Sequence, residues 1–371
     1  MTEENDIKTT CLHPRHMALG AVMSPFAGFD MPISYEGITE EHQAVRTACG
    51  MFDVSHMGEV LIEGKDAMAF VNHIFTNDVT RMADRDVVYG MMLHPHGGVV
   101  DDLLVYRFTE TTFLLVINAS NIAKDIEWIR ANTDGYDVTV TDLSDVASEI
   151  AVQGPLSEEV VRSVLGIEGS DLKFYTFKQA IAPDGSPLLV SRTGYTGEDG
   201  FEIYGTAYTI CDMWDRLIES GRCKPCGLGC RDTLRFEAGL PLYGDELADD
   251  ITPIEAGLSM FVKIDKPDGF IGRDACAAQK AQGPARKSVG LELHDRAVAR
   301  HGAEVIDPAT GNVIGVVTTG YRGISTDRSI AVALIDSHFT ARGTEVAVKV
   351  RRKVFPATVT GRRFVDTHYK K

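Results

Sequence analysis

The sequence predicts an α+β protein whose chain ends in a small antiparallel β-barrel. Strand-like and helix-like patterns alternate over the first three quarters of the 371 residues, which indicates mixed α+β structure. This rhythm occurs twice, which favours two related subdomains without a detectable sequence repeat. After the break at 282–284, only short strands with turn signals follow. We therefore expect two α+β subdomains within residues 1–285 and the barrel within residues 286–371.

The first α+β rhythm runs from about residue 59 to about residue 133. EVLIEG (59–64) has the composition of a strand, and KDAMAFVNHIF (65–75) has the spacing of an amphipathic helix. HPHGG then joins two strands as a hairpin turn, because its two glycines are free to adopt positive φ. These strands span 87–93 and 99–107. Strand FLLVIN runs into a helix with Ser120 or Asn121 as its cap, over 113–118 and 119–133.

The second rhythm begins with the strands YDVTVTDL (136–143) and SEIAVQG (148–154). PLSEEVVRSVLG (155–166) follows as a helix that we expect to start at its proline. A second hairpin lies within 187–205 and precedes a helix over 206–221. The expected barrel strands are GAEVID, VIGVVTTG, SIAVALID, TEVAVKVRRKV and PATVTGRR.

The charge of the chain is distributed unevenly. The formal net charge of −16 argues against nucleic-acid binding through the field of the whole protein. Between Lys349 and Lys371, however, eight basic residues stand against Asp366 alone, so this segment carries +7 and the remainder −23. An anionic partner that docks near the C-terminus and a solvated strand edge protected by cations are both consistent with this pattern.

The sequence predicts a cytoplasmic protein that neither enters a membrane nor holds a metal. No apolar stretch approaches the ~18 residues of a membrane span, and the acidic N-terminus is neither a secretory signal nor a transit peptide. Seven cysteines, an odd number, favour free thiols. Cys223, Cys226 and Cys230 are closely spaced, but the nearest further ligands, His294 and His301, lie more than 60 residues away. We therefore expect buried thiols there.

Two adjacent acids, Asp101 and Asp102, interrupt the apolar run GGVVDDLLVY. Because side chains alternate across a strand, the two carboxylates point to opposite faces, and Asp102 shares its face with Leu104 and Tyr106. Asp101 shares the other face with Arg107, so one acid can meet solvent or Arg107 while the other lies on an aromatic and aliphatic wall. That arrangement suits a ligand pocket. An ordinary strand end or turn on a sheet edge would explain the pair equally well.

Four segments are unusual together, although no common nucleophile, phosphate-loop or zinc motif is present. GMFDVSHMGE (50–59) places Asp53, Ser55 and His56 among apolar residues, and the Asp101–Asp102 hairpin follows. TGYTGEDGFEI (193–203) combines glycines with Tyr195 and three carboxylates. GLGCRDTLRFEAGLPLYG (227–244) carries Arg231, Arg235 and Glu237 on a helix between glycines. Each segment alone also fits a turn rich in glycine and acids, or a helix with ion pairs.

In this order, DVSHMGE, GGVVDDL, RTGYTGEDGFE and RDTLRFEAGLPLYG closely resemble the glycine cleavage T-protein (aminomethyltransferase) family. The resemblance covers essentially the whole chain, from PFAGFDMPISY (25–35) onward. It implies two interleaved α+β subdomains and a barrel in a three-domain, cloverleaf-like arrangement. It also implies release of ammonia from the aminomethylated lipoyl arm of the H protein. The one-carbon unit passes to tetrahydrofolate, which gives methylenetetrahydrofolate and the dihydrolipoyl carrier.

The resemblance implies a role for ten residues of this sequence. Asp102 matches the catalytic acid of the family, a fixed anion that stabilises developing positive charge and orients the folate amine. Asp101 has no chemical role assigned by the resemblance. Glu202 matches the carboxylate for the pterin edge, and Arg231 matches a ligand-contacting arginine. The remaining matches to the folate slot are Met57, Tyr89, Leu104, Tyr106, Asn118, Tyr195 and, near the C-terminus, Tyr369.

One segment departs from the family pattern. TTGYRGIST (318–326) stands where the family usually has TSG followed by Ser-Pro, which bears on carrier docking or tunnel shape. The basic C-terminal segment could meet the acidic carrier or the glutamyl tail of folate. Two alternatives remain: a folate-dependent demethylase, and a folate-binding iron–sulfur assembly factor. The latter carries a Lys-Gly-Cys-Tyr-x-Gly-Gln-Glu segment that this sequence lacks.

Overall fold

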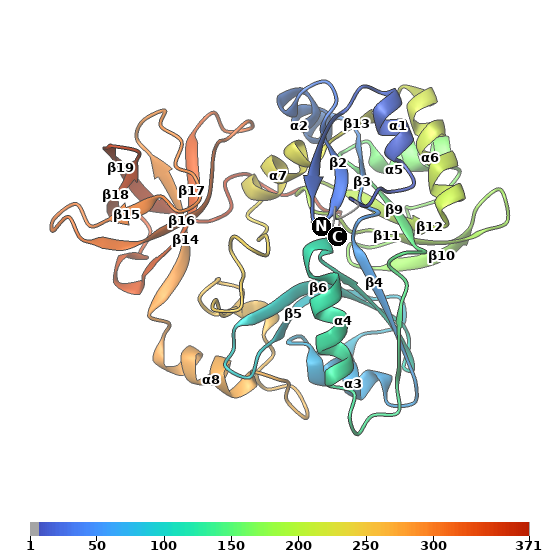
Figure 1. Cartoon of the computed structure of the whole chain (residues 1–371), viewed down its shortest axis with the longest axis horizontal. Coiled ribbons are helices and arrows are strands. Elements are labelled where there is room, and N and C mark those ends of the chain that lie inside the picture. The colour runs from blue at the N-terminus through green and yellow to red at the C-terminus, as the bar shows by residue number, and fades with distance from the viewer. Residues whose placement is uncertain (1–6, 371) are drawn as a thin grey trace, which may run out of the picture.

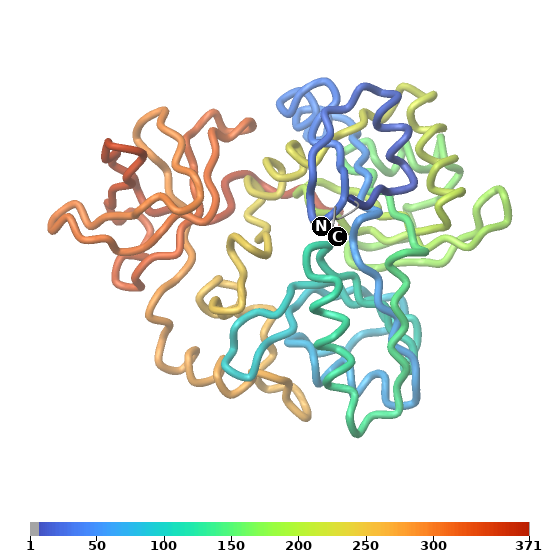
Figure 2. The backbone as a smooth tube through the Cα atoms, viewed as in Figure 1, coloured from blue at the N-terminus to red at the C-terminus, as the bar shows by residue number. Residues whose placement is uncertain are grey.

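Three lobes surround the centre of the molecule in the computed structural model, which describes residues 7–370 (Figure 1). Two lobes are built on separate β-sheets with helices packed against them, and the third is a closed six-stranded barrel. The backbone tube in Figure 2 shows the barrel joined to the other lobes by a long connecting segment. This architecture confirms the predicted α+β class and the terminal antiparallel barrel.

The first lobe is a six-stranded sheet with the order β10-β11-β12-β9-β3-β13. Its central strand β9 sends Ile150 and Val152 to a face covered by Trp214 of helix α6, and Ala151 to the opposite face. Both faces are therefore buried, as the apolar run of β9 requires. The strands are β3 (Gly50–Asp53), β9 (Ser148–Gln153), β10 (Phe177–Ile181), β11 (Pro187–Ser191), β12 (Gly200–Gly205) and β13 (Lys224–Pro225).

Helices cover this first sheet on both sides. Helix α6 (Ala207–Ser220) forms as predicted: the Thr206 hydroxyl accepts from the backbone N–H of Thr209, and Gly221 ends the helix at φ 63°. The helix expected to start at Pro155 begins instead at Ser157, because Leu156 takes the N-cap position. The other helices are α1 (His13–Ala18), α2 (Ile38–Thr47), α5 (Ser157–Val160) with a π-turn over Val161–Leu165, and α7 (Leu228–Glu237).

The second lobe is a five-stranded sheet with the order β5-β6-β7-β4-β8. Strands β3 and β4 are consecutive in the chain but belong to different sheets, so the two lobes are interleaved. Helices α3 (Ala67–Ile74) and α4 (Ile122–Ala131) share an apolar core with one face of this sheet. The strands are β4 (Gly58–Glu63), β5 (Val87–Leu93), β6 (Val99–Thr109), β7 (Thr112–Ile117) and β8 (Thr139–Asp142).

The β5–β6 hairpin, which carries the two adjacent aspartates, forms where the sequence predicted it. Gly97 adopts φ 93° in its turn, as expected for a hairpin glycine. Gly98 is needed for another reason: a Cβ there would lie 1.7 Å from the backbone oxygen of Asp249. The turn is therefore packed against the connecting segment of the chain.

The third lobe is the closed barrel β14-β17-β16-β15-β18-β19. Strand β14 (Arg286–Leu293) was missing from the predicted strands, although it pairs with both β17 and β19. Its mixed sequence, RKSVGLEL, alternates polar and apolar residues only weakly. The other strands are β15 (Glu304–Ile306), β16 (Val313–Arg322), β17 (Ser329–Asp336), β18 (Glu345–Val350) and β19 (Lys353–Thr360), and the segment before the barrel holds α8 (Arg273–Gln282).

Apolar contacts hold the barrel against the first lobe. Phe236 of α7 packs on Ile330 and Val332 of β17, together with Phe364 beyond the last barrel strand. A two-stranded ribbon, β1 (Val22–Phe26) with β2 (Phe29–Ser34), completes the first lobe. Among residues 7–370, no helix combines the length and apolar composition that crossing a membrane requires.

Candidate active site

A central cavity of about 730 Å³ lies where the three lobes meet. Strands β5, β6 and β12 and helix α7 supply lining residues, and the barrel contributes others. A volume of this size is typical of sites that enclose most of a small organic ligand. The lining includes Asp102, the most distinctive acid of the sequence.

Asp102 is held rigidly in the cavity wall by neighbouring strands. The Tyr89 hydroxyl donates to one carboxylate oxygen at 2.8 Å, and the Asn118 side-chain amide donates to the other at 2.9 Å. Burial, and next the charge of Asp101, raise the pKa of Asp102 to about 7, and these two donors only partly oppose that rise. Asp102 can therefore gain or lose a proton near neutral pH.

The two adjacent aspartates do point to opposite faces, and Asp102 is only partly buried, in the cavity wall. Strand β6 lies between β5 and β7, which excludes the sheet-edge interpretation. Asp101 is fully buried, and it does not pair with Arg107 as the strand faces suggested. Arg107 instead donates to Asp84 at 3.1 Å and to the backbone oxygen of Met82. Asp101 is bound by Asn118 and Asn121, which sequence spacing alone did not indicate.

Another part of the cavity wall combines a cation, an aromatic ring and a carboxylate. The Arg231 guanidinium lies over the Tyr195 ring at 4.7 Å, and within residues 7–370 it has no ion-pair partner. Tyr195 is fixed by a hydrogen bond from its hydroxyl to the backbone oxygen of Pro241. Glu202 accepts a hydrogen bond from Thr193, and burial raises its pKa against the opposing effects of Thr193 and Arg231. This wall offers both acceptors and a cation to a polar heterocycle.

The structure brings eight of the ten predicted site residues to the cavity wall. They are Met57, Tyr89, Asp102, Leu104, Asn118, Tyr195, Glu202 and Arg231. Tyr106 is not among them, because its ring is fully buried behind the wall and its hydroxyl lies 3.1 Å from those of Ser191 and Tyr204. Tyr369 is also absent from the wall. Its ring stacks on Phe174, 4.2 Å away, and Phe174 stacks in turn on the lining residue Tyr175.

Several lining residues were not predicted from the sequence. Phe261 packs its ring edge against Tyr89 at 4.8 Å, and Glu149 is buried in the wall with one oxygen that no donor among the described residues reaches. Lys287 and Arg342 extend the lining onto the barrel. All four lie outside the recognised motifs, so only the three-dimensional packing identifies them.

Most other polar residues of the four motifs build the framework around the cavity. Asp53 accepts hydrogen bonds from Thr10 at 2.5 Å and from the backbone N–H of Ser55 at 3.0 Å. Asp199 binds the buried Arg192 through both oxygens, at 2.9 and 2.6 Å. These ion pairs and caps fix the loops that carry the lining residues.

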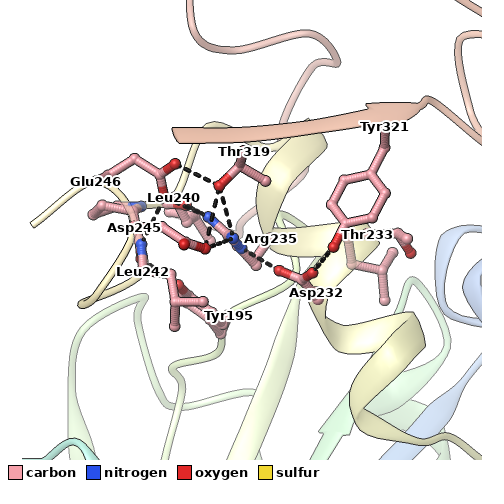
Figure 3. Close-up of polar contacts among 12 residues, drawn as sticks. Tyr195, Asp232, Thr233, Arg235, Leu240, Leu242, Asp245, Glu246, Thr319 and Tyr321 are labelled. Atoms are coloured by element: carbon pink, nitrogen blue, oxygen red, sulfur yellow. Dashed lines mark hydrogen bonds and ion pairs between the residues drawn. The ribbon is translucent and has the colours of Figure 1, made fainter. Parts of the chain in front are cut away.

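Arg235 links three parts of the molecule, as Figure 3 shows. It donates to Glu246 at 2.7 Å and to Asp232 at 2.7 Å, and it lies 3.4 Å from the hydroxyl of Thr319 on the barrel. It therefore does not face the cavity as Arg231 does. The helical spacing of these two arginines could not distinguish their roles, since both belong to one turn of α7.

The cysteine cluster has its polar groups already engaged. Glu41, Cys226 and Cys230 bring potential ligand atoms within 4.8 Å of one another. The Glu41 carboxylate, however, accepts backbone N–H groups from residues 35, 36, 37 and 227. Burial raises the pKa of the Cys226 thiol well above its ordinary value. These groups are consistent with the expected buried thiols beside a loop-capping carboxylate.

Family models match almost the full length of the chain. The model described as "GCVT N-terminal domain" matches residues 12–266, and "Glycine cleavage T-protein C-terminal barrel domain" matches residues 286–366. The chain belongs to the glycine cleavage T-protein family.

Comparison with individual T-proteins supports the same family assignment. The aminomethyltransferases of Alkaliphilus oremlandii and Caldanaerobacter subterraneus are 47% and 46% identical to this chain. The matches cover 99% of this chain and 100% and 98% of those proteins, respectively. The crystal structure of the glycine cleavage system aminomethyltransferase T from Bartonella henselae is 34% identical, with a TM-score of 0.93 over 99% of this chain and 100% of that one. The predicted transferase class is therefore confirmed.

Proposed function

We propose that this T-protein takes the aminomethyl group from the lipoyl arm of the H protein, releases ammonia and transfers the one-carbon unit to tetrahydrofolate. The observation that carries this proposal is the position of Asp102, a half-buried acid fixed by Tyr89 and Asn118 in the wall of a ligand-sized cavity. Tetrahydrofolate supplies the amine nitrogens that accept the carbon. The products are methylenetetrahydrofolate, dihydrolipoyl H protein and ammonia.

The cavity wall fits the folate chemically. Glu202 is an acceptor for the N–H edge of a pterin, and Arg231 is a cation that forms no ion pair with a carboxylate of the described residues. Tyr195 and Phe261 offer aromatic surface, while Met57 and Leu104 offer apolar cover. These residues would bind and orient the ligand, and the enclosing loops would exclude water from the reacting carbon.

Asp102 then has two roles in turnover. As an anion it stabilises the positive charge that develops on the carbon as ammonia departs. Its carboxylate can also act as a base and accept the proton that the attacking amine loses. It can return that proton to the departing sulfur, so that the two amine protons end on ammonia and on the thiol. Each acceptor oxygen is already oriented by a donor, which limits reorganisation during the reaction.

An ammonia-release assay with aminomethylated H protein tests this function. With tetrahydrofolate present, we expect Asp102→Asn to lose about two to three orders of magnitude in kcat, because a fixed charge of this type contributes roughly that much. Folate binding should change far less, since Glu202 and Arg231 remain. Asp84→Asn is the matched control, because Asp84 is an exposed acid of the same lobe. Equal turnover by Asp102→Asn and wild type would exclude the assigned role.

A further inference from the structure

A third acid, Asp125 of helix α4, lies behind the two aspartates of β6. Its side chain is fully buried, and no donor among residues 7–370 forms a hydrogen bond with either oxygen. Asn121, four residues before it, donates to the Asp101 carboxylate at 2.7 Å, and Asp101 acts on Asp125 through its charge and a side-chain hydrogen bond. Because two ionised carboxylates repel each other, a contact of this kind needs a proton between them.

The hydrogen bonds around the pair decide which acid holds that proton. Asp101 accepts from the backbone N–H of Asn118 at 3.0 Å, from its side-chain amide at 2.8 Å, and from the side-chain amide of Asn121 at 2.7 Å. Donors of this type stabilise the ionised form. Asp125 receives no such bond, so the proton resides on Asp125 and its O–H donates to Asp101.

Local helix geometry explains why Asn121 and Asp125 reach the same carboxylate. They are four residues apart at the start of α4, so their side chains lie on one face of the helix. Asn121 was expected as a helix cap, but it makes no side-chain cap hydrogen bond and its amide turns to Asp101. The first turn of α4 is therefore built around the Asp101 anion.

The other charged and titratable groups near the pair do not replace this proton. Lys124 Nζ forms an ion pair with Asp125 at 3.9 Å, too long for a hydrogen bond, and donates to the backbone oxygen of Val100 and to the Tyr243 hydroxyl. The Tyr243 hydroxyl in turn lies 3.3 Å from Asp249. Burial first, and then the charge of Asp101, raise the pKa of Asp125 far above its ordinary range, with Lys124 opposing.

We propose that Asp101 and Asp125 hold a single proton between them, on Asp125, and that the fixed anion at Asp101 makes its neighbour Asp102 a better proton acceptor. Neither residue lines the cavity, so both are positioning residues that act through Asp102. The benefit for turnover rests on the function proposed above. The location of the proton does not, because it is argued from the donors around Asp101 and from the buried, donor-free carboxyl group of Asp125.

This arrangement gives the otherwise unassigned Asp101 a physical role. An aspartate in water has a pKa near 3.9 and is a weak base at neutral pH. Burial, and next the charge of Asp101, raise the pKa of Asp102 to about 7, where a base is most effective at cellular pH. If Asp125 were also ionised, a second buried negative charge would accumulate without a donor to stabilise it.

Titration of Asp102 by NMR tests the proposal on the full chain labelled with ¹³C at the aspartate carboxyl carbon. The Asp102 signal is assigned by its loss in Asp102→Asn. In wild type it should titrate near pH 7. Asp125→Asn should leave that midpoint within about 0.3 units, because the neutral amide still donates to Asp101. Asp101→Asn should lower it by about one unit or more, because a neighbouring like charge is lost.

The decisive comparison is between the two variants. If the Asp102 midpoint falls by about one pH unit in Asp125→Asn, Asp125 is ionised in the wild type and the proposal is overturned. A wild-type Asp102 midpoint near the ordinary aspartate value would also overturn it. In Asp101→Asn, an amide NH₂ faces the backbone N–H of Asn118, so that two donors oppose each other. If this variant does not fold, the Asp102 midpoint in Asp125→Asn decides alone.

A pH profile of kcat/KM for ammonia release provides the functional measurement. In wild type and Asp125→Asn, kcat/KM should fall on the acidic side with a midpoint near pH 7. In Asp101→Asn this acidic limb should lie about one pH unit lower, with roughly tenfold lower kcat at pH 8. A limb in Asp101→Asn that coincides with wild type would exclude the coupling to turnover. If wild type releases no ammonia, the proposed function fails, while the NMR midpoints still decide where the proton lies.

Discussion

Glu202 and Glu149 line the same cavity but differ in their hydrogen-bond donors. Glu202 accepts from Thr193, whereas one oxygen of Glu149 has no donor within residues 7–370. Burial raises the pKa of both groups, and Arg231 opposes the rise in both. For Glu149 the charges of Glu202 and Glu59 add to the rise, which Tyr204 and Arg231 oppose, so ionisation is disfavoured more at Glu149 and we expect Glu202 to be the acceptor.

Glu202→Gln should therefore weaken folate binding selectively. The amide would present an NH₂ group to the N–H edge of the pterin and leave a buried donor unpaired, which costs about 1–3 kcal/mol, or roughly ten- to hundredfold in Kd. Tetrahydrofolate binding measured by fluorescence titration gives Kd, and kcat at saturating folate should fall less. Glu219→Gln on the exposed side of α6 is the control. A large fall in kcat with unchanged Kd would contradict the binding role of Glu202.

For single residues, the sequence predicts the position correctly where the alternation of side chains along a strand is sufficient to place them. It placed Asp102 on the face of Leu104, and both line the cavity. It failed for Asp101, whose partners come from the start of α4, because the packing of that helix on the sheet is a tertiary property. Tyr106 shares the strand face of Asp102, yet neighbouring strands of the first lobe cover it, so a shared face is necessary but not sufficient for a place in the cavity wall.

Helix α7 shows how one element serves both the site and the framework. Arg231 near its start lies in the cavity wall, and Arg235 one turn later is buried between Glu246 and the barrel residue Thr319. The strands and helices themselves were largely predictable, because hydrophobic period, caps and turn glycines act locally. Strand β14 and the start of α5 were not, since pairing across the barrel and the N-cap at Leu156 override weak local signals.

Arg235→Met should destabilise the junction of α7, the connecting segment and the barrel. The change leaves Glu246 buried without its cationic partner, and breaking a buried pair in this way costs about 3–5 kcal/mol. Urea unfolding measures the loss, and Arg235→Lys should recover only part of it because a lysine cannot reproduce the several directed N–H bonds. Arg328→Met removes an exposed pair with Glu292 and should cost less than about 1 kcal/mol. Similar losses in both methionine variants would contradict the assigned difference.

Across the whole molecule, the basic C-terminal segment does not form one surface. Arg362 and Arg363 line the central cavity, and Arg362 donates to the backbone oxygens of Ala256 and Gly257. Arg351 and Arg352 belong instead to a separate groove at the β18–β19 turn of the barrel. Lys371 lies outside the described residues. The sequence shows how many charges the segment carries but not where they lie, because the chain after β19 returns only Arg362 and Arg363 to the centre.

The cations at the cavity should favour folates with long, negatively charged glutamyl tails. Lys287 and Arg342 are exposed barrel residues of the lining and have no ion-pair partner within residues 7–370. We expect Lys287→Met combined with Arg342→Met to weaken binding of tetrahydrofolate pentaglutamate roughly tenfold more than that of the monoglutamate. Added salt should reduce the difference, because exposed charges are screened over about 8–10 Å at physiological ionic strength. Fluorescence titration at low and high salt measures both affinities.

The matched control for this charge effect is Arg351→Gln combined with Arg352→Gln, which removes the same number of cations from the barrel groove. If local charge at the cavity governs tail binding, this control should change either affinity by less than about twofold, since its cations are not part of the cavity lining. An equal loss of pentaglutamate affinity in both double variants would instead attribute the effect to the overall charge of the protein. The comparison therefore separates a local contact from a long-range field on a molecule whose net charge is −16.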